Sequence, residues 1–191
     1  NQKILDLKLL YVELDSFVYY DASKVSNVNA LKTRIIEGLT TYSKSTDVNK
    51  FGGRFKYSKA LNIIDDIDKA ITSNITRVKI RRNLRAVLNS FAQYELCFGN
   101  QFRINQEGKN IKSTGFTIEG ENEIVYITDI PNKDNNGNLD GSGQGVISIV
   151  REDSLRNTVV VVKSAGTVDY IHGEIILTTV NITSTVKENN V

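Results

Sequence analysis

One stretch decides how the fold begins: LYVELDSFVYYD, residues 10–21. Apolar and polar side chains alternate along it, so they fall on opposite faces of an extended chain. Glu13, Asp15 and Asp21 share the polar face. The apolar face carries Leu10, Val12, Leu14, Val18 and Tyr20. This period of two predicts a half-buried β-strand.

Two helical patterns follow this strand. Ser26 or Asn27 can cap the first helix, because a short polar side chain accepts a hydrogen bond from a free backbone N–H of the first turn. The second pattern begins at Ser58, after an expected loop at Asp47–Gly53, and Thr72–Asn74 should break it. The two apolar stripes are Leu31, Ile35, Leu39 and Tyr42, and then Ala60, Leu61, Ile64 and Ile67.

A second alternating strand closes this half of the chain. Thr76, Val78 and Ile80 alternate with Arg77, Lys79 and Arg81. The order strand, helix, helix, strand is typical of an α+β domain whose helices cover one face of a sheet. We therefore expect an α+β domain at residues 1–89.

From Ser90 onward the pattern is β-rich. Short runs with strand character are separated by pieces rich in glycine, asparagine and aspartate, such as Lys133–Gly145 and Ser164–Gly166. The expected strands are Phe91–Phe98, Ser113–Ile118, Glu123–Ile130, Val146–Val150, Thr158–Lys163 and Glu174–Val186. We predict a second, β-rich domain at residues 90–191.

Composition excludes several classes of protein. The longest purely apolar run is Val159–Val162, whereas a membrane-spanning helix needs about 20 apolar residues. Cys97 is the only cysteine and His172 the only histidine, so an internal disulfide and a His/Cys zinc site are both excluded. No credible nucleophile–base pair remains. We expect no enzymatic activity and no cofactor. Since the chain starts at Asn1 and lacks methionine, we also expect it to be a piece of a longer protein.

Two loops resemble ligand-binding motifs only in part. Oxygen-bearing side chains alternate along Asp134–Gly141, as in a calcium loop, but Ile147 stands where a bidentate glutamate is needed and no helix flanks the loop. Gly141–Gly145 is glycine-rich like a phosphate loop, yet a strand follows it instead of a helix. We expect an exposed hairpin and no metal or nucleotide. We also expect His172 to be a turn residue between two strands and Cys97 to be a small packed side chain.

Charge is unevenly spread along the chain. Residues 1–100 carry a net +6 and residues 101–191 a net −4, and the excess is concentrated between Lys50 and Arg85. The candidate docking residues are Lys50, Arg54, Lys56, Lys59, Arg77, Lys79, Arg81 and Arg82. Phe51, Phe55 and Tyr57 lie among them, which suits single-stranded nucleic acid. A solvated face and a surface for an acidic protein remain the other interpretations.

The order of these segments resembles a known family. Tyr19-Tyr20, the helix ending near Tyr42, FGGRFKYSK at 51–59, IIDD at 63–66 and ITSNIT at 71–76 precede a basic strand. A second block comprises GTVDY at 166–170, GEIIL at 173–177 and NITS at 181–184. Both blocks resemble the C-terminal part of the baseplate wedge ring protein of T-even-like contractile-tailed phages, a relative of the baseplate J-like proteins. The large N-terminal region of that family is absent here.

The resemblance implies a structural virion protein of the tail baseplate, present in the host cytoplasm during assembly. Its partners would be copies of itself, as a dimer and as a ring in the full protein, and other baseplate wedge proteins. It implies no catalytic residues. With this resemblance we expect the basic residues to dock protein and not nucleic acid. A nucleic-acid-binding α+β module using the 50–85 patch is the alternative, followed by a calcium-dependent adhesion module.

Overall fold

The computed structural model describes residues 10–187, and these form two compact units that divide between Arg81 and Arg82. The predicted mixed α+β class is confirmed: two helices occur with mostly antiparallel sheets. The sequence suggested a boundary after Asn89. In the structure, Asn89 already donates its backbone N–H to Ile182 O at 2.8 Å, which ties this segment to the second unit.

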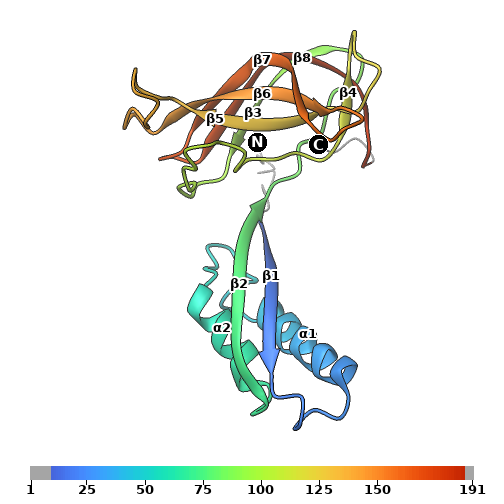
Figure 1. Cartoon of the computed structure of the whole chain (residues 1–191), viewed down its shortest axis with the longest axis vertical. Helices are drawn as coiled ribbons and strands as arrows, with labels where there is room; N and C mark the ends of the chain where they lie inside the picture. The colour runs from blue at the N-terminus through green and yellow to red at the C-terminus, as the bar shows by residue number, and fades with distance from the viewer. Residues whose placement is uncertain (1–9, 188–191) are drawn as a thin grey trace, which may run out of the picture. The chain divides into compact units, whose positions relative to one another are not determined.

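The first unit contains a β-ribbon and two helices (Figure 1). Strand β1 (Tyr11–Tyr20) pairs antiparallel with β2 (Ile71–Arg81), and α1 (Val28–Lys44) and α2 (Tyr57–Asp66) lie between them in the chain. Asn27 caps α1, since its Oδ1 accepts from Ala30 N at 3.0 Å. Of the two caps expected, Asn27 is the one used.

The helices approach each other at Gly38. A Cβ at this position would lie 2.9 Å from Ile67 Cδ1, so glycine permits a close crossing of α1 against the segment that ends α2. Arg34 strengthens the contact with a 2.7 Å ion pair to Asp68. The small core of this unit comprises Leu31, Tyr42, Ala60, Ile64 and Ala70.

Helix α2 ends at Asp66, and residues 72–74, which we expected to break the second helical pattern, lie in β2. Tertiary contacts support the strand here, because the side chains of Thr72 and Asn74 each find a partner. Thr72 Oγ1 donates to Tyr19 O at 3.2 Å, and Asn74 Nδ2 donates to Asp65 Oδ1 at 2.7 Å. These bonds hold β2 to β1 on one side and to α2 on the other.

The second unit is β-rich. Its strands are β3 (Phe91–Cys97), β4 (Phe116–Ile118), β5 (Tyr126–Pro131), β6 (Gln144–Glu152), β7 (Thr158–Asp169) and β8 (Glu174–Thr185). They form a nearly closed antiparallel sheet in the order β3-β8-β7-β6-β5, with β4 beside the C-terminal part of β8 (Figure 1). Its fully buried side chains include Phe116, Val125, Ile147, Ile149, Val168, Tyr170, Leu177 and Ile182.

The expected turn at Ser164–Gly166 is wrong, because these residues lie inside β7. Ile147 pairs with Gly166 and Ile149 with Val162, so three residues of β7 stand opposite Ser148 alone. This is a β-bulge, which bends the strand and interrupts regular alternation. The small residues that suggested a turn instead serve close packing: a Cβ on Gly166 would lie 2.1 Å from Ile176 O.

No helix in residues 10–187 is long and apolar enough to cross a membrane.

Candidate docking surface

The ribbon of β1 and β2 presents one face that we call the open ribbon face. Directly opposed residues of an antiparallel pair point to the same side, so the register defines this face. It carries Tyr11, Glu13, Asp15, Phe17 and Tyr19 from β1 and Ser73, Ile75, Arg77, Lys79 and Arg81 from β2. All of these residues except Arg81 are exposed, and Arg81 is half-buried.

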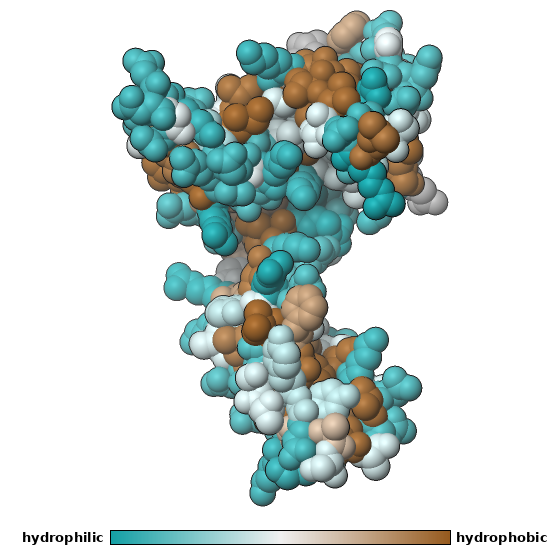
Figure 2. All heavy atoms as spheres, viewed as in Figure 1, coloured by the Kyte–Doolittle hydropathy of each residue, from teal (hydrophilic) through white to brown (hydrophobic). Residues whose placement is uncertain are grey.

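One end of the open ribbon face is apolar. Phe17 and Ile75 lie directly opposite each other in the register and are 56% and 54% exposed. Tyr19 extends this end and is also exposed. In the view of Figure 2, hydrophobic and hydrophilic atoms are interspersed on this unit. A large apolar side chain exposed singly is ordinary, but adjacent ones on one face are typical of an interaction site.

The other end of the same face carries both signs of charge. Asp15 lies opposite Arg77 and Glu13 opposite Lys79. Arg81 reaches diagonally across the ribbon, with its Nε 2.6 Å from Glu13 Oε1 and its guanidinium 4.4 Å from the centre of the Tyr11 ring. The strand that is basic in sequence is therefore flanked by acidic side chains. Sequence reasoning missed this neutralisation because it depends on the register of β1 against β2.

Contacts with α2 come from residues of β2 that alternate with those of the open ribbon face. Thr76 is buried, and its carbonyl accepts from Tyr57 Oη at 2.7 Å. The Asn74 side chain bonds to Asp65 of α2. Since residues alternate along a strand, Arg77 and Lys79 lie on the face away from these contacts with α2.

The basic residues of the 50–59 segment lie elsewhere, in the loop between α1 and α2 and in the first turn of α2. Lys50, Arg54 and Lys56 line a hollow of about 210 Å³ together with Tyr42 and Asp47. Lys59 forms an ion pair with Asp47, which lowers the pKa of that carboxyl and raises the pKa of the Lys59 ammonium. This segment is a second basic site, separate from the open ribbon face.

Arg82 occupies a third place. It follows β2 and belongs to the second unit, where its guanidinium lies 5.9 Å from the Phe98 ring. The eight candidate residues thus fall into three groups: Arg77, Lys79 and Arg81 on the open ribbon face; Lys50, Arg54, Lys56 and Lys59 around the helix–helix loop; and Arg82 alone.

The other residues considered from the sequence are engaged in local structure. Asp134 Oδ1 accepts from the backbone N–H groups of Asn136 and Asn138, both at 2.9 Å, which fixes a turn of the 133–145 loop. His172 lies between β7 and β8, with Nδ1 2.8 Å from Asp169 Oδ2. Cys97 is half-buried at the end of β3. Within residues 10–187 no cluster of three or more His, Cys, Asp or Glu side chains could hold a metal ion.

Residues 8–83 match the family described as baseplate structural protein gp6, C-terminal domain III. This match confirms the resemblance to a baseplate wedge protein for the first unit. The second block of the resemblance, residues 166–184, lies outside the matched range. No curated protein matches the chain.

Proposed function

We propose that this chain is a non-enzymatic structural subunit of a contractile-tail baseplate, and that it associates with copies of itself and with other wedge proteins. The observation that carries the proposal is the match of residues 8–83 to a baseplate structural family. That range contains both strands of the open ribbon face. The subunit would occupy the virion tail baseplate, pass through the host cytoplasm during assembly, and form dimers and, in the full protein, a ring.

We infer that α1 and α2 cover one face of the ribbon and leave the open ribbon face for a partner. The buried Thr76 and the contacts of Tyr57 and Asn74 lie on the covered side. A two-stranded ribbon is marginally stable unless its faces pack, so a partner on the second face would add stability as well as affinity.

The charge pattern of this face fits a second copy. Acidic side chains lie on β1 and basic ones on β2, so two faces related by a two-fold axis parallel to the strands bring the acidic strand of each copy over the basic strand of the other. Phe17 and Ile75 supply the apolar part of such a contact. Complementary charges set orientation and rate of association more than affinity.

Nucleic acid is the alternative partner, and one observation favours it. Phe51 is 93% exposed beside Lys50 and Arg54, which is an arrangement that suits base stacking next to phosphate contacts. The open ribbon face is less suited, because Glu13 and Asp15 would repel phosphates bound to Arg77 and Lys79. For this reason we favour protein as the partner of the ribbon.

The test compares both partners in one set of samples. We expect the Arg77→Gln/Lys79→Gln variant to weaken self-association in sedimentation equilibrium, whereas Lys50→Gln/Lys56→Gln should leave it unchanged. Binding to single- and double-stranded DNA and RNA is measured beside it at about 150 mM salt, near physiological ionic strength.

Sub-micromolar nucleic-acid binding that is lost in either variant while self-association persists would overturn the proposal. A steep fall of that binding with salt would identify phosphate contacts, because they release counterions.

A further inference from the structure

The helix–helix loop gathers basic side chains around one hollow. Lys50, Arg54 and Lys56 line it together with Asp47, which is the one acidic residue between positions 38 and 64 of the chain. Asp47 is engaged by Lys59 in an ion pair. Among residues 10–187 no acidic side chain forms an ion pair with any of the three lining cations. The lining of the hollow therefore keeps three positive charges once Asp47 is assigned to Lys59.

Hydrogen bonds tie each of these cationic residues to the fold through its backbone. Lys50 O accepts a backbone N–H of the loop at 2.9 Å, and Arg54 N donates to Asp47 O at 2.9 Å. Lys56 N donates to the hydroxyl of the buried Tyr42 at 3.1 Å. Because the backbone is already held, the cationic side chains start from defined positions, and binding a ligand costs less ordering of the loop.

The side chains around the hollow are mainly hydrogen-bond donors. Lysine and arginine side chains donate and cannot accept. The Tyr42 hydroxyl accepts from Lys56 N, and no group in the described part of the chain accepts the proton of this hydroxyl. A ligand that fits must therefore supply acceptor oxygens and negative charge. A carboxylate does both, and the planar guanidinium of Arg54 can bind it through two parallel hydrogen bonds.

The aromatic residues of the loop favour protein over nucleic acid as the source of this anion. Single strands bind by stacking successive bases on exposed aromatic rings. The Phe55 ring instead packs 6.3 Å from that of Tyr42, and the Tyr57 hydroxyl donates to a carbonyl of β2 at 2.7 Å. Phe51 is the most exposed of the three, at 93%. One aromatic anchor beside Arg54 is typical of protein interfaces, in which aromatic residues and arginine are enriched.

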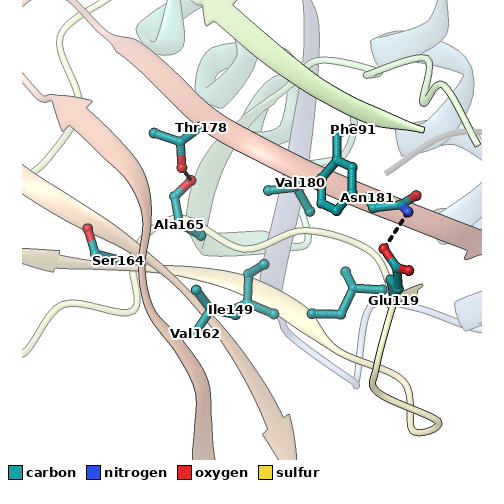
Figure 3. Close-up of a pocket in the computed structure, with 10 residues that line it drawn as sticks. Phe91, Glu119, Ile149, Val162, Ser164, Ala165, Thr178, Val180 and Asn181 are labelled. Atoms are coloured by element: carbon teal, nitrogen blue, oxygen red, sulfur yellow. Dashed lines mark hydrogen bonds between the residues drawn. The ribbon is translucent and has the colours of Figure 1, made fainter. Parts of the chain in front are cut away.

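The larger cavity of the second unit has a different chemistry. Its volume is about 240 Å³, and Figure 3 shows mostly apolar side chains around it, among them Ile149, Val162 and Phe91. Glu119 is its one charged lining residue, and it accepts from Asn181 Nδ2 at 2.8 Å. Charge therefore does not select a ligand at this cavity, whereas it does at the hollow of the helix–helix loop.

We propose that this hollow binds a carboxylate side chain from an acidic segment of a partner protein other than a second copy, and that Phe51 packs against an apolar residue beside that carboxylate. The inference rests on the proposed association with other wedge proteins and gives it a place apart from the open ribbon face. Arg54 binds the carboxylate oxygens, and Lys50 and Lys56 supply further positive charge. Complementary charges set orientation more than affinity, so contact with Phe51 is needed for tight binding.

A glutamate peptide tests the site directly. Fluorescence anisotropy is measured on the whole chain with a labelled peptide in which glutamates flank one leucine, and with a matched peptide that has glutamines in their place, at about 150 mM salt. We expect the glutamate peptide to bind at least about tenfold more tightly. Lys50→Gln/Lys56→Gln should abolish this preference. Lys32→Gln/Lys69→Gln removes the same charge at exposed positions of the same unit and should keep it. Equal loss in both double variants would show unspecific attraction and overturn the inference.

Further samples identify other occupants. Inorganic phosphate that displaces the peptide at the concentration of the peptide itself would show a site for a free anion and overturn the inference. Single-stranded DNA that binds more tightly than the peptide, and is lost in Lys50→Gln/Lys56→Gln, would assign the hollow to nucleic acid. Self-association that is weakened by Lys50→Gln/Lys56→Gln would assign it to a second copy. Either result contradicts an acidic segment of another protein.

The apolar anchor has its own variant. Phe51→Ser should weaken binding of the glutamate peptide at least about tenfold, with circular dichroism to confirm that the chain is folded. Peptide binding unchanged by Phe51→Ser would contradict the role of this ring. A chain that self-associates but does not bind the glutamate peptide would overturn this inference alone. A chain that binds the peptide but is monomeric at every concentration would support this inference and overturn the proposed self-association.

Discussion

The hydroxyl of Tyr170 donates a 2.7 Å hydrogen bond to Oδ2 of Asp129, and both side chains are fully buried. The other carboxylate oxygen of Asp129 accepts from Ile111 N at 2.6 Å. Burial and the neighbouring carboxylate raise the pKa of the Tyr170 hydroxyl well above its usual value. This pair connects β5 to the end of β7 inside a mostly apolar core, so it should contribute to the stability of the second unit.

Tyr170→Phe should therefore destabilise the second unit. The substitution leaves Asp129 Oδ2 buried without its donor, at a cost of about 1–3 kcal/mol in the free energy of unfolding. Urea denaturation measures this change. Tyr126→Phe, at a partly exposed position of β5, is the matched control and should cost little. Equal stability of Tyr170→Phe and the wild type would show that the hydrogen bond is not needed.

The pKa of His172, the only histidine in the sequence, should lie above the ordinary value for a histidine. The hydrogen bond and charge of Asp169 raise the pKa of His172 above 6.5, and the His172 backbone N–H and ring lower the pKa of Asp169. Protonated His172 therefore favours the folded state below pH 6.5, and this contribution is lost as pH rises through the raised pKa.

Proton NMR follows this titration without ambiguity, because no other histidine is present. Asp169→Asn should bring the midpoint back toward 6.5. A midpoint at or below 6.5 in the wild type would contradict the ion pair.

Gly166→Ala should destabilise the bulged part of β7. A Cβ there would lie 2.1 Å from the backbone oxygen of Ile176, and backbone cannot move aside as a flexible side chain can. We expect a loss of about 1–3 kcal/mol in the free energy of unfolding, as for other overpacked sites. Thr167→Ala, at the exposed neighbouring position, serves as control. Thermal or urea unfolding that does not distinguish the two variants would refute the close approach.

The 133–145 loop should bind calcium no more tightly than about 1 mM, the weak end of known calcium modules. Asp134 already accepts two backbone N–H groups, and Asp140 accepts both the N–H and the hydroxyl of Ser142. Calorimetric titration checks this expectation. Micromolar binding that disappears in an Asp134→Ala/Asp140→Ala variant would show that the carboxylates serve an ion instead of the turn.

Local patterns allowed much of the fold to be predicted. Alternation identified β1, helical stripes identified α1 and α2, and turn residues separated most strands of the second unit. The error at residues 164–166 has one cause: strand pairing and a bulge overrode residue propensities. Such pairings join residues far apart in the chain, and a single sequence does not reveal them.

The candidate site was predictable only as a set of residue types. Arg77, Lys79 and Arg81 were expected on one face because alternation is local. Their acidic neighbours Glu13 and Asp15 could not be anticipated, since the register of β1 against β2 places them there. The sequence likewise does not reveal that the 50–59 segment lies apart from this face, because that separation depends on tertiary structure.

The most direct test of the docking role of the open ribbon face compares two exposed phenylalanines of the same unit. Phe17 lies on this face and Phe51 in the helix–helix loop. Sedimentation equilibrium is run on wild type, Phe17→Ser and Phe51→Ser, with circular dichroism to confirm that all three are folded. We predict that Phe17→Ser weakens self-association at least about tenfold and that Phe51→Ser leaves it unchanged. Self-association that is unaffected by Phe17→Ser and lost in Phe51→Ser would contradict the account.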